Sequence, residues 1–238
     1  MSAFLLKLIA VIAMTIDHVG YFVTIKHPEF IWMRVIGRIT MPIMSFFIVQ
    51  GYVHTKNFKK YLLRMGIFAV ISHFAYNLCF GEGSGVMTTF FIALICIYCA
   101  DKTKDRVNGM LQPLFFIVGG LLAEFLTADW GLTGLLIIMV FWFGRDNKKV
   151  AFSGIFGVVL FTFLSEFLNA ASSGYTINFD TFFVAFIQSA ILLAVPLLLT
   201  YNGKRGLNDK FKNFNKWLFY AYYPLHLIII YIYNTYVL

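Results

Sequence analysis

Long apolar runs, separated by short polar stretches, dominate this chain. Nine of these runs reach or approach the roughly 20 residues that an α-helix needs to cross a membrane. They cover residues 4–25, 34–53, 61–80, 87–100, 111–127, 131–143, 150–169, 181–200 and 217–237. The fourth and sixth runs are short, which favours helices that are tilted, broken or shielded by protein. The pattern therefore predicts an all-α, polytopic integral membrane bundle of about nine transmembrane helices.

The composition also favours a membrane protein over a soluble one. Hydrophobic residues make up 60% of the 238 residues and charged residues only 13%, whereas an average soluble domain carries about 25% charged residues. The first apolar run has no small-residue cleavage site and contains charged residues, so it predicts a retained helix rather than a signal peptide. We expect residues 1–238 to form one domain, located in a bacterial cytoplasmic membrane.

The basic residues predict the orientation of this bundle. All of the 19 Lys and Arg residues except Lys26, Arg34 and Arg38 lie near the N-terminus or follow the second, fourth, sixth and eighth runs. By the positive-inside rule, these positions face the cytoplasm, which places the N-terminus inside and the C-terminus outside. Topology and contact with anionic lipid thus explain the net charge of +8 without a nucleic-acid partner.

Polar residues within the apolar runs mark a candidate site, because a charge at bilayer depth costs about 2.5–3.5 kcal/mol or more. Arg34 and Arg38 are one helical turn apart, and Asp17 and His18 lie in the preceding run. Neighbouring residues point about 100° apart on a helix, so we expect Asp17 to meet an arginine and to leave His18 free for a substrate. In the predicted topology, polar residues from at least five runs share a depth near the outer face: Asp17, His18, Arg34, Arg38, His73, Asn77, Glu124, Asp129 and Glu166.

A second cluster lies at the predicted cytoplasmic face, around the start of the third run. It consists of His54, Thr55, Lys56, Asn57, Lys59, Lys60, Tyr61 and Arg64. The positive-inside rule explains its cations as loop charges, but the cluster could also hold the phosphates of a cytosolic, nucleotide-bearing donor. In the last run, Pro224 frees a backbone carbonyl, and His226 is either a structural residue or a participant in chemistry. Cys96 and Cys99 favour packing over metal binding, so no metal is expected.

Four motifs follow one another along the chain. They are Ile16-Asp17-His18-x-Gly20, Arg34-x-x-Gly37-Arg38-x-x-x-Pro42, Gly51-x-x-His54-Thr55-x-Asn57-x-x-Lys60-Tyr61-x-x-Arg64 and Tyr223-Pro224-Leu225-His226. This set resembles the TraX family of multi-spanning inner-membrane proteins, which are named for conjugative pilin acetylation and are similar to transmembrane acyltransferases. The resemblance implies transfer of an acetyl group from cytosolic acetyl-CoA, the acyl donor, to an acceptor at the outer half of the membrane. The acceptor would be a hydroxyl or amine of a cell-envelope glycan or of a peptide such as pilin.

The resemblance also implies roles for the intramembrane residues. His18 is the expected general base, and Arg38 or Arg34 would stabilise the oxyanion that forms at the thioester, unless both only neutralise Asp17 or other buried carboxylates. Possible additional site residues are His73, Glu124, Glu166 and His226. The main alternative is a proton-coupled membrane transporter whose relay uses the same titratable residues. A channel or a scaffold needs fewer such groups at one depth.

Overall fold

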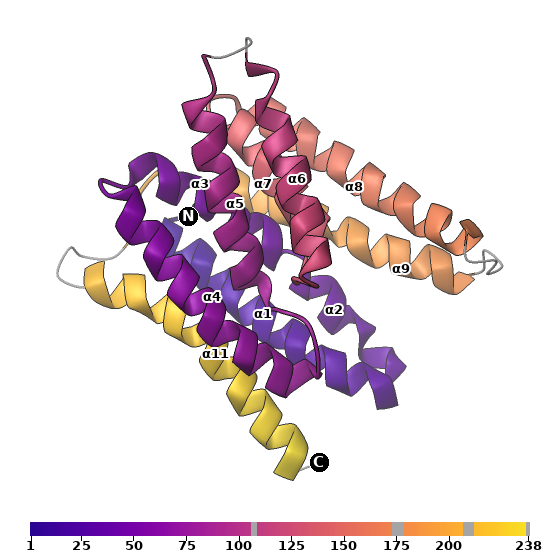
Figure 1. Ribbon diagram of the computed structural model, residues 1–238. Coiled ribbons are helices and arrows are strands. Elements are labelled where there is room, and N and C mark those ends of the chain that lie inside the picture. The colour runs from indigo at the N-terminus through magenta and orange to yellow at the C-terminus, as the bar shows by residue number, and fades with distance from the viewer. Residues whose placement is uncertain (106–108, 173–178, 207–211, 237–238) are drawn as a thin grey trace. The chain divides into compact units, whose positions relative to one another are not determined.

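The computed structural model describes residues 1–105, 109–172, 179–206 and 212–236, which are predominantly helical (Figure 1). Four of the described helices are long and apolar enough to cross a membrane: Ala3–Lys26, Pro28–His54, Phe58–Phe80 and Lys148–Asn169. The shortest of them has 22 residues, which at about 1.5 Å per residue exceeds a hydrocarbon core of about 30 Å. The fold is therefore that of a helical membrane protein, while the span count of nine and the orientation stay predictions.

The helices follow the apolar runs of the sequence. In order they are α1 (Ala3–Lys26), η1 (Pro28–Ile31), α2 (Trp32–Gly37), α3 (Thr40–His54), α4 (Phe58–Phe80), α5 (Val86–Lys102), α6 (Gln112–Phe125), α7 (Gly131–Phe143), α8 (Lys148–Ser172), α9 (Phe179–Ser189), η3 (Ala190–Leu193), α10 (Ala194–Leu199) and α11 (Lys212–Tyr236).

Two of the predicted helices are interrupted, and a proline explains each interruption. The second run divides between α2 and α3, and the eighth divides into α9, η3 and α10. A proline ring clashes with the carbonyl four residues before it and supplies no N–H. For Pro42 this carbonyl belongs to Arg38, which lies between α2 and α3. For Pro196 it belongs to Leu192 in η3. The predicted apolar spans over 34–53 and 181–200 are therefore helical but interrupted.

Contacts divide the chain into two compact units. The first comprises Met1–Met44 and Asp146–Gly206, and the second comprises Ser45–Arg145 and Leu207–Leu238. The assignment of residues 1–238 to a single domain stays a prediction.

In the first unit, α1 packs along η1 and α2, and α8 lies beside α9 (Figure 1). The start of α1 is tied to the segment that follows α10. The N–H groups of Ala3 and Phe4 donate to the carbonyls of Lys204 (2.9 Å) and Arg205 (3.0 Å). The N-terminal residues and the segment after α10 thus lie together in this unit. The basic residues predict the same side of the membrane for both.

In the second unit, α5 contacts α4, α6 and α7, and α4 also contacts α11 (Figure 1). Two connecting segments meet at one end, where the Ser84 N–H donates to the carbonyl of Thr127 (3.0 Å) and the Asp129 N–H donates to that of Ser84 (2.7 Å). Cys96 is buried in α5, and its thiol donates to the carbonyl of Phe115 in α6 (3.1 Å).

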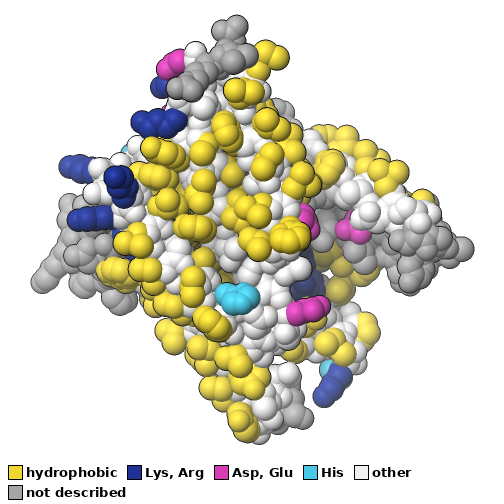
Figure 2. Space-filling view, viewed as in Figure 1, with side chains coloured by type: hydrophobic (Ala, Val, Ile, Leu, Met, Phe, Trp, Pro, Cys, Tyr) yellow, Lys and Arg dark blue, Asp and Glu magenta, His cyan; other side chains and the backbone are white. Residues whose placement is uncertain are grey.

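The outward surfaces of α4 and α6 are apolar, as a lipid-facing surface requires. Figure 2 shows hydrophobic side chains over most of the visible face of these helices, with Lys and Arg gathered toward one end of it. Exposed residues of the two helices include Leu63, Val70, Phe74, Leu121 and Phe125. A contiguous apolar surface of this kind is unfavourable in water, so its presence supports a membrane location.

Candidate functional site

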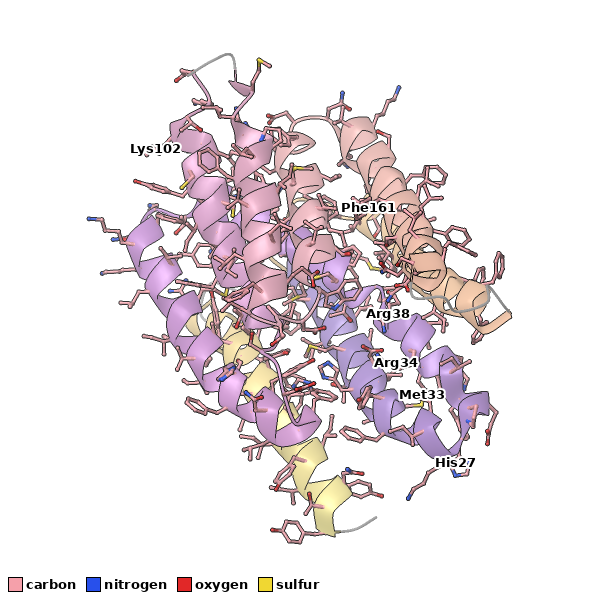
Figure 3. The ribbon with its side chains drawn as sticks, turned by 45° about the vertical axis from the view of Figure 1, so that its right-hand side comes forward. His27, Met33, Arg34, Arg38, Lys102 and Phe161 are labelled. Carbon is pink, nitrogen blue, oxygen red and sulfur yellow. The ribbon has the colours of Figure 1, made fainter. Side chains whose placement is uncertain are left out.

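Asp17 of α1 and two arginines, Arg34 and Arg38, form an ionic cluster inside the first unit (Figure 3). Asp17 Oδ1 lies 2.8 Å from Arg34 Nη1 and 3.9 Å from Arg38 Nη2. Arg34 Nη1 also donates to the backbone carbonyl of Asp17 at 2.9 Å. The side chains of Asp17, Arg34 and Arg38 are only 13%, 22% and 12% exposed. The predicted pairing of Asp17 with an arginine is confirmed, and because two cations share one carboxylate, the cluster keeps a net positive charge.

Two glycines let α1 and α2 approach closely enough to form this cluster. A Cβ atom on Gly37 would overlap the side chain of Asp17, and one on Gly20 would lie 2.7 Å from the Cβ of Met33. Each helix therefore contributes one glycine to the contact, three residues after its charged residue. The spacings Asp17-x-x-Gly20 and Arg34-x-x-Gly37 thus have a packing explanation that the sequence reasoning missed.

Arg38 lies at the interruption between α2 and α3 rather than within a continuous helix. The N–H of Arg38 donates to the carbonyl of Val35 (3.2 Å), closing a turn tighter than that of an α-helix. Just beyond it, the Thr40 hydroxyl donates to the carbonyl of Ala10 on α1 (3.0 Å). The interruption is therefore held against α1 on both sides, by Asp17 before it and by Ala10 after it.

His18 is buried, with 7% of its surface exposed. It continues a stripe of buried residues on α1 that recurs every four positions, through Ala10 and Met14. His18 also interacts with another part of the chain, and its role toward a substrate stays a prediction. Glu166 of α8, in the same unit, is half-buried and forms no ion pair with any residue that the structure describes.

His73, Asn77 and Glu124 belong to the second unit. Asn77 Nδ2 donates to the carbonyl of His73 (3.1 Å) and lies 3.1 Å from its ring Nε2, so the two residues share one face of α4. Glu124 Oε1 accepts from the N–H of Leu132 (2.8 Å) and so caps the start of α7. The proposed common depth of these residues with Asp17 stays a prediction.

The motif in α11 links that helix to α5. Tyr223 is 3% exposed, and its hydroxyl accepts from the N–H of Val86 at 3.1 Å, in the first turn of α5. His226 is 4% exposed, and its Nδ1 lies 3.0 Å from the carbonyl of Tyr222. Because a carbonyl can only accept, Nδ1 carries the proton in this contact. The sequence reasoning singled out His226 and gave no role to Tyr223.

Three residues of the predicted donor cluster have local structural partners. Asn57 Oδ1 accepts from the N–H of Lys60 at 2.9 Å and caps the start of α4. His54 Nδ1 donates to the carbonyl of Gln50 at 2.9 Å. Tyr61 is buried, and a Cβ on Gly51 would lie 2.7 Å from its hydroxyl. These contacts shape the turn between α3 and α4.

The cations of this cluster occupy two different environments. Lys56 and Lys60 are exposed, and no carboxylate of the described chain forms an ion pair with either. The guanidinium of Arg64 lies over the rings of Tyr61 (5.6 Å) and Tyr220 of α11 (5.3 Å), and cations are stabilised over such rings. Arg64 thus helps to join α4 to α11.

The apolar helices and the buried ionic cluster define a helical membrane protein with a buried polar site. Residues 2–234 match the model of the TraX family, which is described as "TraX protein". The chain therefore belongs to this family. It is 27% identical over 249 residues to the "Probable fimbrial assembly protein FimC, serogroup H1" of Dichelobacter nodosus, covering 96% of this chain and 94% of that protein. It is also 28% identical over 246 residues to the "Uncharacterized protein RP591" of Rickettsia prowazekii (strain Madrid E), covering 97% and 92%. No solved structure is significantly similar to the chain.

Proposed function

We propose that this protein is an acetyltransferase embedded in the bacterial cytoplasmic membrane, which uses cytosolic acetyl-CoA and an acceptor hydroxyl or amine. The observation that carries the proposal is the ionic cluster of Asp17, Arg34 and Arg38 within apolar helices, next to the buried His18. A net positive charge that is buried among apolar helices costs free energy. Charged side chains in such surroundings usually belong to functional sites. Membership of the TraX family, whose name refers to pilin acetylation, supports acyl transfer as the reaction.

The residues have distinct roles in the proposed reaction. The acceptor oxygen or nitrogen attacks the thioester carbonyl carbon while its proton passes to the ring of His18. The C–S bond then breaks, and the CoA thiolate leaves and takes up a proton. Negative charge develops on the carbonyl oxygen, where Arg38 or Arg34 supplies the compensating positive charge. Asp17 holds both guanidinium groups in place.

The proposal includes nine transmembrane spans with the N-terminus in the cytoplasm and the C-terminus outside. It places the basic cluster around Lys56 and Lys60 at the cytoplasmic face, where acetyl-CoA is available. The acceptor lies at the outer half of the membrane, as a cell-envelope glycan or a peptide amine. A relative named as a fimbrial assembly protein supports a fimbrial or pilin subunit as one such acceptor.

The test is a comparison of cell-envelope material from cells with and without the protein, by mass spectrometry. Gain of one acetyl group on an envelope component, lost in the Asp17→Asn variant, is the expected result. The purified protein should also bind acetyl-CoA and gain thermal stability from it. A transporter would instead show substrate flux coupled to pH, with neither an acetylated product nor any dependence on acetyl-CoA, and that result would overturn the proposal.

A further inference from the structure

Aromatic side chains form a continuous row in the second unit, where α3, α5 and α7 end and α4 begins. The ring of Tyr52 lies edge-on to Trp142 (5.6 Å between centroids) and to Phe58 (5.4 Å). Phe58 is in turn stacked on Tyr98, with centroids 4.6 Å apart and planes only 4° from parallel. Trp142 is 3% exposed and anchors one end of the row, whereas Tyr98 is 39% exposed at the other end.

One lysine lies near the exposed end of this row, and a second follows Phe58 in the chain. The ammonium of Lys102, at the end of α5 (Figure 3), lies 5.8 Å from the centre of the Tyr98 ring. Lys59 directly follows Phe58 in the chain and is exposed. Among the described residues, no carboxylate pairs with either lysine. The carboxylate of the nearby Asp101 instead accepts a hydrogen bond from the hydroxyl of Tyr52 in α3 (3.0 Å).

The buried end of the row contains an unsatisfied donor. The indole N–H of Trp142 has no hydrogen-bond partner among the residues that the structure describes. Buried donors of this kind are rare, because an unmade hydrogen bond costs free energy unless a ligand or water supplies the acceptor. Arg145 adds a cation here, with its guanidinium 4.1 Å from the Trp142 ring.

We propose that this row, together with Lys59 and Lys102, binds the phosphorylated adenosine end of the acyl donor. Adenine stacks on the exposed ring of Tyr98, and the two lysines neutralise the phosphates. The positive-inside rule explains the lysines but not an aligned aromatic pair whose exposed ring lies beside Lys102. The inference rests on the proposed function, since it specifies where acetyl-CoA is held. It adds Lys102 and Tyr98 to the cluster predicted from the sequence.

The charge test uses the full-length protein in nanodiscs and measures acetyl-CoA binding by calorimetry. The variant K59Q/K102Q should bind acetyl-CoA at least about tenfold more weakly than the wild type, because two charge-assisted contacts are lost. The matched control K148Q/K149Q removes two exposed lysines of the first unit and should bind like the wild type. Equal weakening in both variants, or in neither, would overturn the inference.

The stacking test uses Tyr98 and a fragment of the donor. Adenosine 3′,5′-bisphosphate carries the base and the phosphates without the thioester, and it should compete with acetyl-CoA on the wild type. The variant Y98L should weaken both ligands by roughly fivefold or more, whereas Y98F keeps the ring and should bind both normally. Displacement of the bisphosphate by anionic lipid in the nanodisc, with no effect of Y98L, would assign the lysines to lipid headgroups and overturn the inference.

The two proposals fail in different ways. A wild-type protein that does not bind acetyl-CoA would refute the proposed acetyltransferase, and the nucleotide site with it. A wild type that binds acetyl-CoA, with K59Q/K102Q and Y98L both unaffected, would refute the nucleotide site alone. Melting temperatures close to that of the wild type in each variant would exclude misfolding as the cause of any loss.

Discussion

Replacing Gly37 by alanine should disrupt the ionic cluster without removing any charge. The added Cβ atom would overlap the side chain of Asp17, so the end of α2 must move away from α1. Overpacking of this kind costs about 1–3 kcal/mol. The same movement lengthens the Arg38–Asp17 contact, which at 3.9 Å is already at the limit of an ion pair. Weakening a partly buried pair adds to the cost, and we expect a total loss of about 2–4 kcal/mol.

The assay is thermal unfolding of the purified protein, in parallel with acetyl transfer. For a chain of this size, the expected loss corresponds to a fall in Tm of roughly 5–15 °C. Gly157→Ala is the matched control, because Gly157 lies in α8 of the same unit and its added Cβ would meet, outside its own turn of helix, none of the described atoms within 4 Å. It should be neutral or slightly stabilising, since alanine favours a helix over glycine by about 1 kcal/mol. Equal melting temperatures for Gly37→Ala and Gly157→Ala would refute the explanation of the Asp17-x-x-Gly20 and Arg34-x-x-Gly37 spacings.

Four further predictions concern the base, the arginine, the α11 motif and the topology. His18→Gln should slow acetyl transfer by about 10²–10⁴-fold with acetyl-CoA binding unchanged by calorimetry; full activity in a folded variant would exclude His18 as the base. Arg38→Lys should be nearly as harmful in the transfer assay, because a point charge does not replace the guanidinium fork, and wild-type activity would contradict this role. Tyr223→Phe should lower the free energy of unfolding by about 1–3 kcal/mol, because the buried Val86 N–H loses its acceptor; an unchanged denaturation midpoint would show that the contact is dispensable. A cysteine introduced at Asn147 should resist labelling by an impermeant reagent in intact cells, and ready labelling there would reverse the predicted orientation.

The helical fold could be predicted from the sequence because its signal is local. Apolar runs fall where the helices lie, and the opposite charges of Asp17 and of the arginines predicted their pairing. The interruptions after Gly37 and at Ala190–Leu193 had a local signal too, since a proline follows each of them. The prediction from apolar runs did not use this signal. Hydropathy alone does not register that a proline lacks an N–H and clashes with the preceding turn.

Other features of the site depend on tertiary contacts and have no local signal. Nothing in the spacing of Gly20 and Gly37 indicates that each lies against the opposite helix. The burial of His18 follows from a stripe with Ala10 and Met14 that any apolar helix could contain. Lys102 is some 40 residues from Phe58 in the chain, and only the stacking of Phe58 on Tyr98 places it beside the donor cluster.

The backbone hydrogen bonds from Ala3 and Phe4 to Lys204 and Arg205 have a consequence for biosynthesis. A ribosome makes α1 about 180 residues before the segment that supplies the partners of its first turn. During synthesis, α1 must therefore remain in the bilayer with its first N–H groups hydrated or held by other proteins. The start of α1 is thus secured only after the segment that follows α10 has been made. A nascent chain that stops before residue 204 should leave that end of α1 open to proteases.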